Sequence, residues 1–233
     1  MKSIAFVLLS FLFYGAGCAQ VPAGNTLQIK SLTQSDVKLD GQLSEKEWTE
    51  VTPVDLRSPW VKRTDHIANY RSFTDRQYFY FGFEVTDTTL MLYVSQEETD
   101  VAKGDRVELF FSDKPDLKNY YCLEMSPADK VLSYRAKHYR VFDNSWDLPG
   151  LVLSARVKKG GYTVEGRIPL AALRQIAGQA AGDTKPFKLY TGVFCGDYFG
   201  ADENDVEWHS WITPKSATPD FHIPSAFGVF EFE

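Results

Sequence analysis

The sequence predicts an all-β fold, an antiparallel β-sandwich of jelly-roll-like topology with one or two short helices. Short segments rich in aromatic and β-branched residues recur along the chain, turn residues separate them at regular spacing, and helix signals are few. No linker rich in Pro, Gly or Ser divides the chain beyond its first residues. We therefore expect one domain over residues 19–233, a length at which β-sandwiches commonly form single domains.

The expected strands share aromatic or alternating apolar residues, and they cover residues 78–85, 106–111, 119–125, 131–141, 151–157, 162–168, 187–195 and 227–232. Within one of these strands, alternation places Val107 and Leu109 on one face and Arg106 and Glu108 on the other. The two runs that flank Gly160 and its neighbouring glycine predict a β-hairpin.

Two short helices are expected between the strands. Ser44 and Glu47 form a capping-box pattern, which predicts one or two helical turns ending near Trp48. A second helix is expected over residues 169–177, because it has proline at its start and Gly178 after its end.

The first residues have the pattern of a secretory signal peptide. Lys2 precedes a mostly apolar run over residues 4–14, which is too short to span a bilayer. Small residues and then Cys18 follow, so we expect a lipoprotein-type signal over residues 1–18 with the lipid on Cys18. Cleavage after Ala19 is the alternative. With such a signal we expect a bacterial protein that is exported to the periplasm, the outer membrane or the cell surface. We expect it to contact a membrane only through its lipid.

The formal net charge of −6 argues against nucleic acid, which needs a basic surface, and against binding to anionic lipid. Aromatic residues make up 15% of the chain and include five Trp, which suit both a sandwich core and the recognition of sugar rings. Cys122 and Cys195 fall in expected strands, where a disulfide is possible and two buried thiols are favoured.

The order of several motifs carries a family resemblance. These are an Asp40–Gly41 turn before the first expected helix, the aromatic run that ends at Asp87, and the motifs at residues 104–111, 161–170, 210–211 and 221–228. Together they resemble the family 9 carbohydrate-binding modules, from about residue 27 to the end of the chain. The resemblance implies a β-sandwich that binds a mono-, oligo- or polysaccharide and often holds structural calcium.

In that family a sugar ring lies between two Trp faces, and polar side chains hold its hydroxyl groups. Trp211 matches the position of the second Trp, and Glu108 matches a carboxylate that accepts hydroxyl hydrogens. Ala102 occupies the position of the first Trp, so the resemblance does not supply a two-sided clamp. Trp60 or Trp146 could supply the missing face from another loop.

The chemistry of sugar binding needs an aromatic platform and charged groups that are held in place. We expect Trp211 to be the platform with Trp208 nearby, Glu108 and Glu124 to accept hydrogen bonds, and Arg106 to donate them. On this interpretation Trp211→Ala abolishes sugar binding. The alternatives are core packing for Trp211, and a solvated ion pair for Arg106 with Glu108.

The acidic loop over residues 197–207 is a candidate calcium site, because calcium takes six to eight oxygen ligands. Asp202 and Asp205 are the predicted ligands, with a solvated loop as the alternative. Asp40 and Asp87 are turn formers first and calcium candidates second.

Non-catalytic saccharide binding, in the service of polysaccharide capture or breakdown, is the preferred interpretation, and two alternatives remain. A glycosidase would need a carboxylate pair, such as Glu108 with Glu124 or Glu165. A haem-binding sandwich would need a Met and a His ligand. The available ligands are Met91, Met125, His66, His138, His209 and His222.

Overall fold

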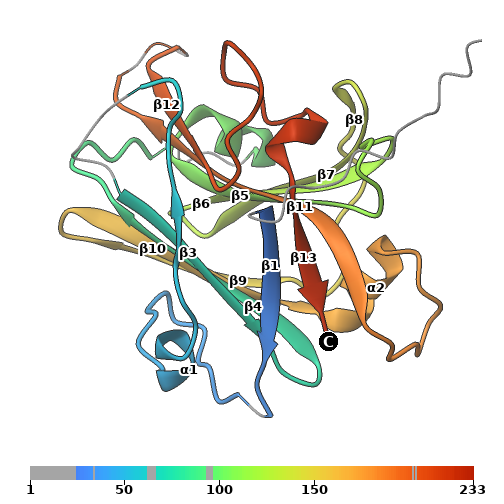
Figure 1. The fold of residues 1–233 in the computed structure, drawn as a ribbon. Coiled ribbons are helices and arrows are strands. Elements are labelled where there is room, and N and C mark those ends of the chain that lie inside the picture. The colour runs from blue at the N-terminus through green and yellow to red at the C-terminus, as the bar shows by residue number, and fades with distance from the viewer. Residues whose placement is uncertain (1–24, 34, 62–66, 93–96, 201, 203) are drawn as a thin grey trace, which may run out of the picture.

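The computed structural model describes residues 25–33, 35–61, 67–92, 97–200, 202 and 204–233. Strands make up most of the regular structure, and Figure 1 shows them arranged in two facing layers. The elements in chain order are β1 (Thr26–Ser31), α1 (Lys46–Thr49), β2 (Val54–Leu56), β3 (Ile67–Thr74), β4 (Tyr78–Thr86), η2 (Glu98–Lys103), β5 (Arg106–Ser112), β6 (Tyr120–Ser126), β7 (Lys130–Lys137), β8 (Val141–Asp143), β9 (Val152–Lys158), β10 (Gly161–Pro169), α2 (Leu170–Ile176), β11 (Phe187–Tyr198), β12 (Val206–Ser210), η3 (Pro224–Ala226) and β13 (Gly228–Phe232).

The strands form one curled path whose two halves face each other as a sandwich. Sheet 1 runs β8-β7-β6-β5-β11-β13, with β12 paired to β11, and sheet 2 runs β3-β4-β10-β9, with β2 paired to β3. β1 joins the two sheets. The predicted all-β sandwich is confirmed.

One strand departs from the antiparallel arrangement, since β1 pairs in parallel with both β13 and β3. A parallel pairing needs a long crossover connection, and the segment that contains α1 and β2 provides it between β1 and β3.

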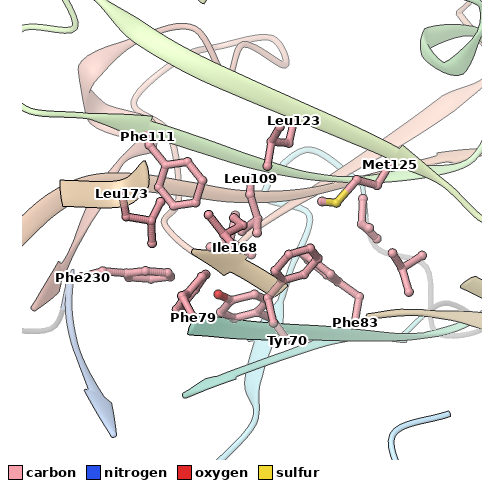
Figure 2. Packing of buried hydrophobic residues seen from close by; sticks show 14 of the residues in the cluster. Tyr70, Phe79, Phe83, Leu109, Phe111, Leu123, Met125, Ile168, Leu173 and Phe230 are labelled. Atoms are coloured by element: carbon pink, nitrogen blue, oxygen red, sulfur yellow. The ribbon is translucent and has the colours of Figure 1, made fainter. Parts of the chain in front are cut away.

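The main core lies between the inner faces of the two sheets. Figure 2 shows Leu109 and Leu123 of sheet 1 facing Tyr70 and Phe83 of sheet 2. These side chains are almost fully buried, and burial of each large apolar side chain is worth about 1.5–3 kcal/mol. Strand alternation selects them, because every second residue of β5 points inward as the sequence predicts.

The outer faces of both sheets are also covered. Phe110, Cys122 and Tyr134 belong to a second cluster on the outer side of sheet 1, which the C-terminal segment 221–227 helps to cover. Trp48 of α1 and Phe73 of β3 belong to a third cluster, on the outer side of sheet 2. Because the segment 221–227 helps to cover the outer face of sheet 1, polar residues that point outward from that sheet can still be buried.

Two local predictions are corrected by the structure. α1 begins at Lys46, its N-cap residue is Glu45, and no side chain caps it, so the capping box from Ser44 is wrong. The expected strand 131–141 is two shorter strands, β7 and β8.

Cys122 and Cys195 are buried thiols that form no disulfide within the described residues, as favoured. Cys195 lies in the core between the sheets and Cys122 in the outer cluster of sheet 1. The two side chains are on opposite faces of one sheet, which rules out a bridge between them. No helix among the described residues is long and apolar enough to cross a membrane.

Candidate functional site

A pocket of about 410 Å³ opens on the outer face of sheet 1. Its floor consists of Arg106 and Glu108 from β5, Glu124 from β6 and Tyr134 from β7. Arg106 and Glu108 are two residues apart on one strand and so share a face, while Glu124 lies directly opposite Glu108 across the strand pair. The register of three neighbouring strands therefore assembles the polar floor.

Arg106 is the centre of this floor. Its Nε atom lies 2.8 Å from Glu108 Oε1 and 2.8 Å from Glu124 Oε2. The single hydrogen on Nε is donated to Glu108, so Glu124 Oε2 is in ionic contact without receiving a hydrogen bond. Nη1 donates to the carbonyl oxygens of Ala102 and Gly104 at 3.0 and 3.3 Å. These bonds fix the guanidinium plane.

The floor keeps hydrogen-bonding capacity for a ligand. Glu124 Oε1 accepts the Tyr134 hydroxyl at 2.8 Å, whereas Glu124 Oε2 accepts no hydrogen bond within the described part of the chain. The hydrogen bonds of Arg106 use Nε and Nη1, and Tyr198 is a further hydrogen-bonding neighbour of the guanidinium. The Glu124 carboxylate and the Arg106 guanidinium are thus held in place beside each other in the floor, and sugar hydroxyl groups bond well to charged groups of this kind.

Trp208 of β12 forms an aromatic wall next to the charged floor. The guanidinium of Arg106 lies 4.9 Å from the centroid of the Trp208 ring, a cation–π arrangement. Gly196 of β11 pairs with Trp208 in register, and a Cβ atom at Gly196 would lie 2.9 Å from the indole ring. The glycine therefore leaves the room that lets the ring lie over the sheet beside Arg106.

A second aromatic side chain lines the pocket from the far edge of sheet 1. Phe142 of β8 is 48% exposed and packs edge-to-face on Tyr134, with ring centroids 5.3 Å apart. In the strand order β8-β7-β6-β5-β11-β12, the charged floor lies between Phe142 and Trp208. The pocket thus has an aromatic side chain on either side of its polar centre.

Burial controls the protonation of the floor. It raises the pKa of Glu108 to about 8, with a further contribution from the Glu124 carboxylate and opposition from Arg106. Burial lowers the pKa of Arg106, but the carboxylates of Glu124 and Glu108 outweigh it, so this pKa lies above its ordinary value. Burial also lowers the pKa of His222 at the rim to about 3. His222 is therefore neutral at physiological pH, and its Nδ1 lies 3.0 Å from the Tyr120 hydroxyl.

Four of the five predicted sugar-binding residues come together in this pocket: Arg106, Glu108, Glu124 and Trp208. The alternative of a solvated Arg106–Glu108 pair is wrong, because their side chains are 7% and 3% exposed.

Trp211, the predicted platform, does not line the pocket. β12 ends at Ser210, and Trp211 then donates its backbone N–H to Val193 and packs against Phe230 at 5.4 Å between ring centroids. A Cβ atom at Gly228 would lie 2.6 Å from its ring. The core-packing alternative accounts for this residue.

Neither Trp60 nor Trp146 supplies the missing aromatic face. Trp60 packs on Phe221 and donates its indole N–H to the Ser216 carbonyl, and Trp146 packs on Tyr121. The residues that the sequence interpretation missed are Tyr134, Arg140, Phe142 and Asp220. The only signal for Tyr134, Arg140 and Phe142 was the density of aromatic and basic residues over 131–142, and Asp220 had none.

The predicted calcium ligands lie in a loop that is stabilised by its own hydrogen bonds. Asp202 is exposed, and its Oδ1 accepts the backbone N–H and side-chain amide of Asn204. Asp205 Oδ2 accepts the backbone N–H of Asp202 at 3.4 Å. Both carboxylates therefore have a role in stabilising the conformation of this loop.

Another set of acidic side chains has the chemistry of a metal site. Carboxylate oxygens of Asp87, Asp105 and Asp197 lie within 4.8 Å of one another, and ligand atoms of Asp197, Glu207 and His209 do the same. All five side chains are buried. Burial raises the pKa of Asp105 to about 8, and the neighbouring Asp87 and Asp197 carboxylates raise it further against two backbone hydrogen bonds. Oxygen ligands packed this closely suit calcium.

The structure also bears on the two alternative functions. Glu165 lies on the outer face of sheet 2, where it accepts backbone N–H groups, and so it forms no pair with Glu108. Glu108 and Glu124 share one guanidinium nitrogen. For haem, Met125 lies in the core and His222 on the outer side of sheet 1, and His66 lies outside the described residues.

The family model for carbohydrate family 9 binding domain-like proteins matches residues 39–233. The chain belongs to this family. The match covers both sheets from the turn before α1 to the end of β13, and it includes every residue of the sheet 1 pocket. This family 9 domain has no match among curated proteins.

Solved structures of similar fold include proteins of two bacteria. A Bacteroides uniformis protein, named as a candidate carbohydrate-binding protein, has a TM-score of 0.67 and 16% identity over 90% of this chain and 99% of its own. A family 9 module of Caldicellulosiruptor kristjanssonii with cellotriose has a TM-score of 0.58 and 14% identity over 89% and 94%. The same module with glucose has a TM-score of 0.56 and 15% identity over 89% and 95%. These likenesses establish the fold.

Proposed function

We propose that this family 9 domain binds a saccharide, without catalysis, in the pocket on the outer face of sheet 1. The observation that carries the proposal is the rigid pair formed by Arg106 and Glu124 beside the Trp208 ring. The apolar face of a pyranose packs on Trp208, and its hydroxyl groups bond to the Glu124 carboxylate and the Arg106 guanidinium. The Caldicellulosiruptor module, which was solved with cellotriose and with glucose, supports the ligand class.

Phe142 has the place of a second platform in this proposal. In the family, the first Trp of the clamp stands at the position of residue 102. This chain has Ala102 at that position, and Ala102 lines the pocket. Phe142 is exposed at the opposite side of the floor. It gives a flat apolar face to a neighbouring sugar unit, which makes an oligosaccharide a better ligand than a single sugar.

Trp208→Ala is expected to weaken saccharide binding at least about tenfold, because the ring supplies the largest apolar contact in the pocket. Calorimetric titration with cello- and xylo-oligosaccharides measures this loss. Trp211→Phe is the matched control, since it changes the Trp that packs on the core. We expect that variant to melt at a lower temperature and to bind as the wild type does. Unchanged affinity in Trp208→Ala would remove this pocket from the proposal.

The proposal includes export and a lipid anchor. Residues 1–18 and Cys18 lie outside the described residues, so the support is the sequence alone: a basic Lys2, a short apolar run and small residues before Cys18. Such a protein would capture polysaccharide at a cell envelope for separate enzymes. Mass spectrometry of the membrane fraction tests this, because Cys18→Ser should lose the lipid mass. Wild-type protein that lacks a lipid would contradict the anchor.

We include a structural calcium ion at Asp87, Asp105 and Asp197, supported by their close, buried oxygens and by the family resemblance. The ion would neutralise carboxylates that are costly to bury together. Calcium should raise the melting temperature relative to chelator, and Asp197→Asn should remove that difference. Asp202→Asn is the control and should retain it. Equal melting temperatures for the wild type with calcium and with chelator would argue against the ion.

A further inference from the structure

A second pocket, of about 570 Å³, lies on the outer face of sheet 2 beneath the loop over residues 41–53. Strand register places its charged side chains on one face: Arg71 on β3, Glu84 on β4, and Arg156 and Lys158 on β9. The pocket is on the other sheet from Trp208 and shares no lining residue with the sheet 1 pocket.

The lining of this second pocket is positively charged. Three cations, Arg71, Arg156 and Lys158, surround the single carboxylate of Glu84. Lys158 Nζ lies 2.7 Å from Glu84 Oε1, and Arg71 Nη1 lies 3.7 Å from Glu84 Oε2. One carboxylate against three cations leaves a formal charge of +2 in a chain whose net charge is −6. The pocket therefore attracts anions that the rest of the surface repels.

The two guanidinium groups have unused hydrogen-bonding capacity. The side chain of Arg71 is only 21% exposed, yet it makes no hydrogen bond within the described residues and only the long contact to Glu84. Arg156 is exposed at the rim and has no ion pair in the same part of the chain. A planar guanidinium binds a carboxylate through two parallel N–H bonds, which an ammonium group cannot do.

The rest of the lining suits a sugar better than a small inorganic anion. Trp48 lines the pocket, is 2% exposed, and has an indole N–H with no acceptor among the described residues. Gln42 and Thr49 add an amide and a hydroxyl group, and Leu43 and Pro53 add apolar surface. We propose that this pocket binds an acidic saccharide, with the carboxylate of a uronic acid unit held by Arg71 and Arg156.

This second site does not depend on saccharide binding in the sheet 1 pocket. The two sites would let one domain hold a neutral and an acidic part of a mixed polysaccharide on opposite faces. The same arrangement would let a protein of net negative charge hold an acidic polymer.

The test is a calorimetric titration with trigalacturonic acid and with its uncharged counterpart, trigalactose, at low and high salt. We expect the acidic trisaccharide to bind the wild type, and to bind Trp208→Ala equally well, with an affinity that falls at high salt. Arg156→Gln should weaken this binding at least about tenfold, the loss of one charge-assisted bond pair. Arg71→Lys keeps the positive charge but removes the planar guanidinium that makes two parallel N–H bonds to a carboxylate, so it should also weaken binding. Both variants should keep the wild-type affinity for the neutral ligand of the sheet 1 pocket.

Several results would overturn the second site. They are no binding of trigalacturonic acid, equal binding of trigalactose, loss of acidic binding in Trp208→Ala, or full competition by inorganic phosphate. Backbone amide resonances give an independent readout, since those of Thr163 and Arg156 should shift with the acidic ligand. Shifts confined to β5 and β6 would place the acidic ligand in the sheet 1 pocket instead. If only the sheet 1 proposal failed, the amide resonances of Thr163 and Arg156 would still shift with the acidic ligand.

Discussion

Arg106→Met should lower the free energy of unfolding by about 3–5 kcal/mol, the cost of leaving buried charges without their partner. Arg106 is in contact with both Glu108 and Glu124, whose side chains are 3% and 8% exposed. Methionine keeps much of the volume and removes the cation. The two carboxyl groups then lie together without a positive charge, where water screens them poorly, so Glu108 must stay protonated and the Glu124 charge loses its partner. Urea unfolding of the wild type and the variant at neutral pH measures the difference.

The loss in Arg106→Met should depend on pH in a defined direction. Burial raises the pKa of Glu108 from its ordinary 4.5 to about 8 even with Arg106 present. The folded state therefore binds more protons than the unfolded state between these values, and the unfolding free energy falls as pH rises through this window. Without Arg106 that pKa rises further. We therefore expect a smaller deficit of the variant at pH 5 than at pH 8.

Neutral partners provide the matched control for this prediction. The triple variant Arg106→Met, Glu108→Gln and Glu124→Gln removes all three charges together, so it should recover more than half of the lost stability. Arg106→Lys should fall between the wild type and Arg106→Met. A deficit in Arg106→Met that persists unchanged at pH 5 would show that lost packing, and not an unpaired charge, causes it.

Strand alternation was the most reliable guide to the fold and to the site. It placed Arg106 and Glu108 on the face opposite Val107 and Leu109, and the structure has them on the outer side of sheet 1. It could not show that this outer face is covered, because the covering segments come from distant parts of the chain. For that reason the sequence allowed a solvated ion pair where the structure has a buried one.

The strands that the sequence analysis missed have weak signals of their own. β3 carries Asn69, Arg71 and Ser72 among its apolar residues, and Arg71 lines the polar pocket on the outer face. β1 is short of apolar residues and is held by pairing with β13 and β3, a contact between the two ends of the chain. Such pairings are a property of the whole topology, which local periodicity does not report.

The choice between the two Trp residues of the 206–211 segment depends on where one strand ends. Trp208 lies within β12 and faces the pocket, whereas Trp211 follows the last residue of β12 and turns towards Phe230. Strand boundaries are the least certain part of a sequence interpretation. Phe142 was out of reach for a different reason, since its role depends on β8 being an edge strand beside β7.

Glu165→Ala should lower the free energy of unfolding by about 3 kcal/mol or more, because one carboxylate oxygen anchors a whole turn to sheet 2. Glu165 Oε1 accepts the backbone N–H groups of Asp40, Gly41 and Gln42 at 2.7, 2.7 and 3.2 Å. Gly41 has φ of +79°, and a Cβ atom there would lie 2.8 Å from the backbone of β9. The turn is therefore packed against the sheet, and the substitution removes the shared acceptor of all three donors.

Glu165→Gln separates the role of the hydrogen bonds from that of the charge. Glutamine keeps an oxygen that can accept the three N–H groups, so its stability at neutral pH should lie much closer to the wild type than that of Glu165→Ala. Burial raises the pKa of Glu165 to about 7, against the lowering by the backbone donors. Its second oxygen, Oε2, has no donor among the described residues, which favours a proton there.

The raised pKa fixes how the wild type and Glu165→Gln should differ with pH. The folded wild type holds a proton on Glu165 that the unfolded chain releases above about pH 4.5, so this contribution to stability is full at low pH and is lost as pH rises through about 7. Glutamine does not titrate. The stability of the wild type relative to Glu165→Gln should therefore fall between pH 5 and pH 8 in urea unfolding, while contributions from Glu108 and Asp105 cancel in the comparison. A difference that grows with pH would mean that the carboxylate is ionised in the folded protein, held by its three backbone donors.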